Sequence, residues 1–156
     1  MENFLNYVRR NLPEYFENTA MLDLGNNLHK KDFKTCRLVS CAWEGNVDYI
    51  TKVNELEFVN NSFDCIIALD YFNKDKTRQN IENTLKGISR LIKQNGMIII
   101  NTDDLRDIMY FKNLAYPYYT VYKIGDEYVM ICVLDGEEFK EILIDDYHGD
   151  DWEKVF

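Results

Sequence analysis

The sequence predicts an α/β protein in which helices pack on a mostly parallel β-sheet. Three features of the stretch 61–102 lead to this prediction. Ser62–Leu69 and Met97–Ile100 are short apolar runs, which are typical of strands buried on both faces. Between them the apolar positions recur at helical spacing: Ile81, Leu85, Ile88 and Ile92. Two buried strands joined by an amphipathic helix form a right-handed parallel crossover.

The ends of this helix can also be predicted. Asp75 is the expected N-cap, because its carboxylate can accept from the free N–H groups of the first turn. Asn95–Gly96 is the expected end, since both residues tolerate the backbone conformation that stops a helix.

Before this unit, the pattern predicts one helix and three short strands. Met1–Leu12 carries its apolar side chains on one stripe, which favours an amphipathic helix over one sheet face, or a lid over a ligand crevice. Pro13 ends that helix or starts a short second turn that carries Tyr15 and Phe16. Strands are expected at Ala20–Leu24, Arg37–Ala42 and Val47–Ile50.

After the crossover, the chain predicts a helix and a β-meander. Asp103–Asn113 has helical spacing and acidic residues at its start. Tyr118–Ile124 and Tyr128–Leu134 alternate in the manner of strands around the hairpin signal Gly125–Asp126. A third strand is expected at Glu138–Ile144.

Composition limits the classes of function. The chain has 156 residues, of which 46% are hydrophobic, and this length predicts a single domain. A net charge of −9 disfavours binding to nucleic acids or to anionic membranes. No apolar run approaches the roughly 20 residues that span a bilayer, and the N-terminus does not resemble a signal peptide. We therefore expect a cytoplasmic protein.

The four cysteines show no metal-binding or redox spacing. They are Cys36, Cys41, Cys65 and Cys132, and no C-x-x-C pair is present. We expect them to be reduced thiols that serve as small apolar residues. The acidic run 145–151 does not match the EF-hand pattern, so we expect a solvated tail and no metal site.

A family resemblance is carried by three motifs. N-S-F-D, which contains Phe63–Asp64, precedes the first apolar strand of the crossover, and R-L-I-K-Q-N-G at Arg90–Gly96 precedes the second. Met21–Gly25 reads M-L-D-L-G. Together they resemble class I S-adenosylmethionine-dependent methyltransferases, of the compact methyltransferase type 11-like kind. The resemblance covers roughly residues 20–102.

The resemblance implies a particular architecture. It is a Rossmann-like three-layer sandwich whose parallel strands have the order 3-2-1-4-5, with an antiparallel C-terminal hairpin at the sheet edge. Within one methyltransferase-like domain over residues 1–156, it implies an N-terminal helical segment (1–18) and a cofactor-binding core (20–102). The C-terminal β-meander (117–144) and the acidic tail (145–156) follow.

The first loop is the expected site for the amino-acid part of S-adenosylmethionine, because ligands bind beyond the carboxyl ends of strands in open α/β sheets. Of the family's three loop glycines, Gly25 is present, whereas Asn27 and His29 occupy the later positions. The glycine motif is therefore degenerate, although Asn and His tolerate positive φ. The resemblance implies these cofactor-binding residues here: Asp23, Leu24, Gly25, Asn26 and Asn27.

The resemblance also assigns residues to the rest of the cofactor. Glu44 is the candidate for the ribose hydroxyls, because a carboxylate can accept two hydrogen bonds. Trp43 either packs on the adenine or belongs to the core. Lys52, Val53 and Asn54 are expected beside the adenine.

Leu69 is expected on the cofactor side after the strand at 62–69, and Asp70 and Tyr71 on the acceptor side. Asp70 would act as substrate base or orienting acceptor, or it simply terminates the strand. The two prolines, Pro13 and Pro117, do not form the motif of amino-group DNA methyltransferases.

Two hypotheses of function remain. In the first, the protein is a small S-adenosylmethionine-dependent methyltransferase, a transferase with a small-molecule or protein acceptor. In the second, it is a catalytically inactive module with the methyltransferase fold that acts through protein or ligand binding. A dinucleotide oxidoreductase is disfavoured because G-x-G-x-x-G is absent after the first strand.

Overall fold

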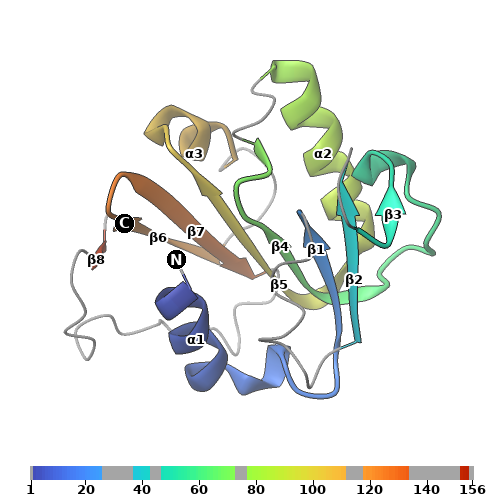
Figure 1. Ribbon diagram of the computed structural model, residues 1–156, viewed down its shortest axis with the longest axis horizontal. Helices are drawn as coiled ribbons and strands as arrows, with labels where there is room; N and C mark the ends of the chain where they lie inside the picture. The colour runs from blue at the N-terminus through green and yellow to red at the C-terminus, as the bar shows by residue number, and fades with distance from the viewer. Residues whose placement is uncertain are drawn as a thin grey trace.

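The computed structural model describes residues 2–25, 37–42, 47–72, 77–111, 118–133 and 152–154. In these residues the chain forms one β-sheet (Figure 1). The strands are β1 (Ala20–Leu24), β2 (Arg37–Ala42), β3 (Tyr49–Ile50), β4 (Phe63–Ala68), β5 (Ile92–Thr102), β6 (Tyr118–Ile124), β7 (Glu127–Val133) and β8 (Trp152–Lys154). Their order across the sheet is β3-β2-β1-β4-β5-β7-β6-β8.

The sheet has a parallel part and an antiparallel part. β1 pairs in parallel with both β2 and β4, β2 with β3, and β4 with β5. β7 runs antiparallel to β5, and β6 antiparallel to β7. Gly125, in the turn between β6 and β7, has a φ of 59°, which glycine adopts at little cost. The predicted order 3-2-1-4-5 with an antiparallel C-terminal hairpin is thus confirmed.

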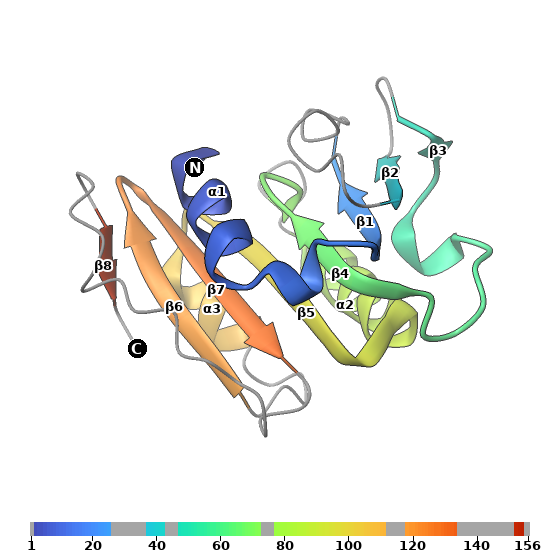
Figure 2. The ribbon, with the colours of Figure 1, turned by 90° about the horizontal axis from the view of Figure 1, so that it is seen from below.

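Helices cover both faces of this sheet, which gives the expected three layers (Figure 2). They are α1 (Glu2–Asn11), α2 (Arg78–Leu91) and α3 (Leu105–Phe111), with 3₁₀ turns η1 (Pro13–Tyr15) and η2 (Val53–Glu55). α1 lies on one face, and α2 and α3 lie on the other.

Strand alternation separates the core into two layers. In β4, Ile66 and Ala68 belong to the layer under α2 and α3, whereas Cys65 and Ile67 belong to the layer under α1. α1 contributes Phe4, Leu5 and Val8 to its layer, and all three are at most 3% exposed. Because every helix buries an apolar stripe against the sheet, the hydrophobic effect fixes the layers.

The boundaries of the crossover helix differ from those predicted. α2 begins after Thr77, whose hydroxyl accepts a hydrogen bond from the Asn80 N–H (3.3 Å); the predicted cap, Asp75, lies outside the described residues. The helix ends at Leu91, and β5 starts at Ile92 rather than after Gly96. The prediction was wrong here because Ile92 pairs with Phe63 across a register shift, a contact that local sequence does not encode.

The F-D motif connects strands at the amino-terminal edge of the sheet. The Asp64 carboxylate accepts hydrogen bonds from the Ala20 N–H (2.9 Å) and from the Lys93 Nζ (3.2 Å). A Cβ at Gly96 would lie 3.0 Å from the Asp64 carbonyl oxygen and 2.7 Å from Ile92 Cδ1, so only glycine fits without a shift. These motif residues therefore hold the fold together and lie away from the carboxyl ends of the strands.

Arg90, which opens the R-L-I-K motif, also has a structural role. Its guanidinium donates to the carbonyl oxygens of Leu56 and Phe58, at 2.6 Å each, in the link from η2 into β4. The Arg90 carbonyl oxygen accepts from the Asn61 N–H at 2.9 Å. A planar, permanently charged group that satisfies several carbonyls fixes this link against α2.

The C-terminal region differs from the prediction in one element. β8 was not predicted, yet it pairs with β6 in antiparallel fashion as the edge of the sheet. The predicted strand Glu138–Ile144 and the acidic run 145–151 lie outside the described residues. Of the cysteines, Cys41, Cys65 and Cys132 are buried free thiols, as expected, and Cys36 lies outside the described residues.

Candidate functional site

The strand order changes direction at β1. β1 lies between β2 and β4. From β1 to β3 the chain adds strands on one side of β1, and β4 and β5 are then added on its other side. In open α/β sheets, ligands bind at such a switch point, beyond the carboxyl ends of the strands. Figure 1 shows the tips of β1, β2 and β4 at the same edge. This edge is the candidate site.

Gly25 follows β1 at this edge. Its N–H donates to the Cys41 carbonyl oxygen of β2 at 3.1 Å. A Cβ at Gly25 would lie 3.5 Å from Asp23 Oδ1 and 4.0 Å from the Leu69 carbonyl oxygen, which are ordinary contacts. The packing of the described residues therefore does not require glycine here. Leu24 is fully buried in the adjacent core, and Asp23 brings a carboxylate that is 2% exposed to the tip of β1.

Several predicted cofactor residues cannot be placed. Asn26, Asn27, His29, Trp43 and Glu44 lie outside the described residues, and their roles stay predictions. The same holds for the degenerate part of the glycine motif.

The segment Lys52–Asn54, which is predicted to lie beside the adenine, packs against α2. Val53 is fully buried, whereas Lys52 and Asn54 are exposed. Gly87 in α2 packs against this turn, where an added Cβ would lie 2.9 Å from the Asn54 nitrogen and 3.0 Å from the Val53 carbonyl carbon. The close approach of the Gly87 backbone to the turn thus fixes the position of Lys52–Asn54 relative to α2.

Tyr71 lies inside the protein and is 3% exposed. Burial raises the pKa of the Tyr71 hydroxyl well above its usual range, and the neighbouring Cys41 thiol raises it a little further. Polar interactions with the Thr84 side chain and the Val53 backbone lower this pKa in part. This places Tyr71 beneath the turn at Val53. Its predicted acceptor-facing role stays a prediction, and burial of the ring does not favour it.

Asp70, in contrast, is exposed and follows β4 directly after the largely buried Leu69 (8% exposed). Its φ is 59°, in the left-handed region that non-glycine residues seldom adopt. Its N–H donates to Asn101 Oδ1 at 2.5 Å, and Asn101 Nδ2 donates back to Asp70 Oδ1 at 3.2 Å. Asn101 is fully buried at the end of β5.

A second carboxyl group joins this pair. Asn101 Nδ2 also donates to Oε2 of Glu127, the first residue of β7, at 3.4 Å. Burial raises the pKa of the Glu127 carboxyl above its ordinary value, the Asp70 carboxyl raises it further, and the Asn101 amide opposes both. Sequence reasoning missed Asn101 and Glu127. The signal for Asn101 was a lone amide directly after the apolar run Met97–Ile100.

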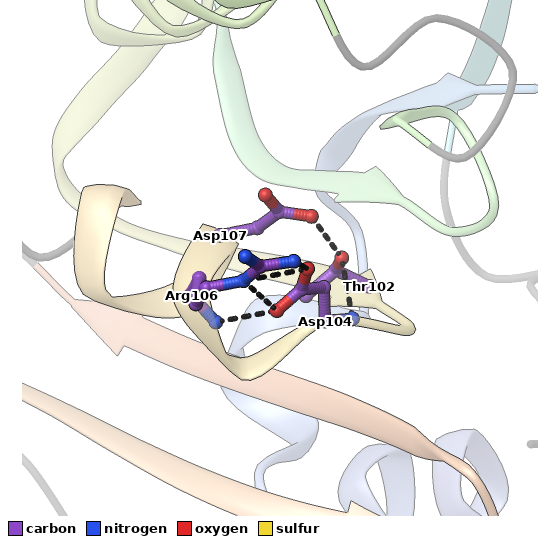
Figure 3. A network of polar contacts seen from close by, with 4 residues as sticks. All are labelled: Thr102, Asp104, Arg106 and Asp107. Carbon is purple, nitrogen blue, oxygen red and sulfur yellow. Dashed lines mark hydrogen bonds and ion pairs between the residues drawn. The ribbon is translucent and has the colours of Figure 1, made fainter.

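A different polar network lies on the opposite face of β5, at the start of α3 (Figure 3). The Thr102 hydroxyl donates to Asp107 (2.7 Å) and accepts from the Asp104 N–H (3.2 Å), and Asp104 accepts from the Arg106 N–H (2.9 Å). These bonds satisfy donors at the beginning of a helix, so this network is structural.

The fold just described is that of class I S-adenosylmethionine-dependent methyltransferases. Among solved structures with this fold, N-methyltransferase NodS from Bradyrhizobium japonicum, in complex with S-adenosylhomocysteine, is 11% identical, with a TM-score of 0.64 and coverage of 84% of each chain. The 1,6-didemethyltoxoflavin N1-methyltransferase of Burkholderia thailandensis, with bound 1,6-didemethyltoxoflavin and S-adenosylhomocysteine, is 10% identical, with a TM-score of 0.64, and the match covers 84% of this chain and 88% of that one. A methyltransferase from Aquifex aeolicus gives 11% identity, a TM-score of 0.61, and coverage of 81% and 89%.

No protein-family model matches the sequence, and no curated protein matches it. Among the helices that the structure describes, none is long and apolar enough to cross a membrane. The described ranges also contain no group of three or more His, Cys, Asp or Glu side chains that could hold a metal ion.

Proposed function

We propose that this chain is a single-domain, cytoplasmic S-adenosylmethionine-dependent methyltransferase whose acceptor is a small molecule or a protein. The observation that carries the proposal is Gly25 at the switch point of this fold. The described packing leaves room for a Cβ at this position, yet the sequence has none. A bare backbone at the tip of β1 suits close approach by a ligand.

The residues at this edge would contact different parts of the cofactor. Asp23 brings a carboxyl group beside Gly25, which would accept hydrogen bonds from the ammonium group of the cofactor's amino-acid part. The turn Lys52–Asn54, which packs against Gly87 and exposes Lys52 and Asn54, would lie along the adenine. Asn26, Asn27, Trp43, Glu44 and Leu69 complete the predicted cofactor-binding set.

Bound S-adenosylmethionine supplies a methyl group that is already activated by the positive charge on sulfur. The protein therefore has mainly to align the acceptor atom with this group and to exclude water. Asp70, exposed at the tip of β4, would accept the proton that the acceptor atom loses as it forms its bond to the methyl carbon. The electron pair of the broken carbon–sulfur bond stays on sulfur.

Calorimetric titration with S-adenosylmethionine and S-adenosylhomocysteine tests the proposal. We expect micromolar binding of at least one of them, and at least a tenfold loss of affinity in Gly25→Val. Gly25→Ala should keep the melting temperature, because its Cβ makes only ordinary contacts. Val59→Ala is the matched control, since Val59 is 80% exposed and precedes β4 at the opposite edge; its affinity should equal that of the wild type.

Absence of binding heat with either ligand, from folded protein, would refute the proposal. The alternative hypothesis of an inactive module with the methyltransferase fold would then stand. If Gly25→Val bound the ligand as strongly as the wild type, the cofactor would bind at a site away from the tip of β1.

A further inference from the structure

The acceptor side of the proposed site contains a linked set of three side chains from three strands. Asp70 follows β4, Asn101 is the second-last residue of β5, and Glu127 begins β7. The middle member is a neutral amide with no exposed surface, and the outer members are carboxyl groups that solvent can reach. A buried amide that contacts two carboxyl groups has few ways to satisfy its hydrogen bonds.

The hydrogen bonds determine how the Asn101 amide is oriented. Its oxygen must face the Asp70 N–H, because that backbone group can only donate. The NH₂ group is then directed at both carboxyl groups, to which it donates at 3.2 Å (Asp70) and 3.4 Å (Glu127). Asp70 is thus held at two points, by its backbone and by its side chain.

The backbone bond stabilises a strained conformation. A non-glycine residue with a φ of 59° persists only where its surroundings hold it, and such residues occur often at functional sites. With this backbone the Asp70 side chain leaves the strand direction of β4 and meets Asn101 of the neighbouring strand.

We propose that Asn101 is the positioning residue of the acceptor side, which holds Asp70 in place beside the Glu127 carboxyl group. This inference rests on the proposed function, in which Asp70 faces the acceptor. Two close carboxyl groups do not both ionise readily, and the raised pKa of Glu127 agrees with this.

The role of the Asn101 amide oxygen and the role of its NH₂ group can be tested separately by mutation. Asn101→Leu removes both the oxygen and the NH₂ group at similar volume. Asn101→Asp keeps an oxygen for the Asp70 N–H but replaces the NH₂ group by an oxygen, which adds a third carboxyl group to the set. Thr102→Val is the matched control, because Thr102 is the next residue of β5, is equally buried, and bonds to Asp107 on the other face.

The measurements are NMR titration of the Asp70 and Glu127 side-chain carboxyl carbons, and hydrogen exchange of the Asp70 amide. In the wild type and in Thr102→Val, the two carboxyl groups should respond to each other's titration. In Asn101→Leu the mutual response should disappear, and the Asp70 amide should exchange about tenfold faster or more. In Asn101→Asp the Asp70 amide should stay protected, while Glu127 titrates at higher pH than in the wild type.

A residue with a merely structural role would lower stability without moving the titrations. Independent titration of Asp70 and Glu127 in the wild type, or an unchanged mutual response in Asn101→Leu, would therefore overturn the inference. Affinity for S-adenosylhomocysteine, measured on the same variants, should not change by more than about twofold, because Asn101 lies on the acceptor side. Failure of the wild type to bind that ligand would refute the proposed function, whereas the carboxyl titration tests the coupling independently.

Discussion

Gly87 of α2 and Asn54 of η2 approach so closely that a Cβ on Gly87 would lie 2.9 Å from the Asn54 backbone nitrogen. Real Cβ atoms hardly ever approach backbone atoms so closely. The helix on one face of the sheet therefore sets the position of a turn at the edge of the candidate site. Mutations in α2 can thus report on the site without touching it.

Gly87→Ala should destabilise the protein and weaken cofactor binding together. Because backbone atoms must shift to admit the methyl group, we expect a loss of about 1–3 kcal/mol in the free energy of unfolding. Urea unfolding and calorimetry with S-adenosylhomocysteine measure the two effects. Lys86→Ala, at the exposed neighbouring position, should change neither. Equal stability of Gly87→Ala and wild type would contradict the close approach.

Arg90→Lys should cost about 1–3 kcal/mol of stability, because a single ammonium group cannot reach the carbonyl oxygens of both Leu56 and Phe58 as the guanidinium does. Arg78→Lys is a suitable control. Arg78 pairs with Glu82 on the exposed surface of α2, with side-chain exposures of 80% and 45%, where ion pairs contribute little. Chemical unfolding of both variants provides the comparison. If Arg90→Lys and Arg78→Lys lowered the free energy of unfolding by equal amounts, the hydrogen bonds of Arg90 would contribute no more than an exposed ion pair.

Glu127→Gln should flatten the dependence of stability on pH. The folded protein binds the Glu127 proton more tightly than the unfolded chain, because burial and Asp70 raise its pKa above 4.5. This contribution is fully present below pH 4.5 and is lost as the pH rises through the folded pKa. Relative to the wild type, Glu127→Gln should therefore become more stable between pH 4 and pH 7, as measured by urea unfolding at each pH.

Asp70→Asn provides a check on the cause of that effect. It removes the neighbouring negative charge, so Glu127 should titrate closer to its ordinary pKa and the pH dependence should also weaken. A wild-type stability that rises from pH 4 to pH 7 by the same amount as in Glu127→Gln would show that Glu127 has an ordinary pKa.

Native thiol labelling should leave three cysteines unmodified. Burial raises the pKa of the Cys41 thiol to about 11, so only about 0.1% is thiolate at pH 8. Burial also raises the pKa of the Cys132 thiol far above its usual range. Cys65 is equally buried. Iodoacetamide treatment followed by peptide mass spectrometry should find these sites modified only after unfolding. Rapid labelling of Cys41 in the native state would mean that the tip of β2 opens readily.

Local sequence determined the layers and the parallel crossover of this protein, whereas the strand order was implied by the family resemblance. The apolar runs at Ser62–Leu69 and Met97–Ile100, with helical spacing between them, predicted the parallel crossover, because hydrophobic periodicity depends on which faces a segment buries. The M-L-D-L-G segment located the tip of β1 and so the edge where a ligand would bind. The motifs R-L-I-K-Q-N-G and N-S-F-D indicated the fold, and the structure gives their residues structural contacts.

Pairing between distant segments decided the rest. Asn101 and Glu127 are 26 residues apart, and they meet only because β7 runs antiparallel to β5 in a register that sets Asn101 against Val129. No local pattern states that register. For the same reason the sequence misplaced the end of α2, since the Ile92–Phe63 pair is a contact between strands. Periodicity records which face of a segment is buried, whereas the partner that covers it is chosen only when the whole sheet assembles.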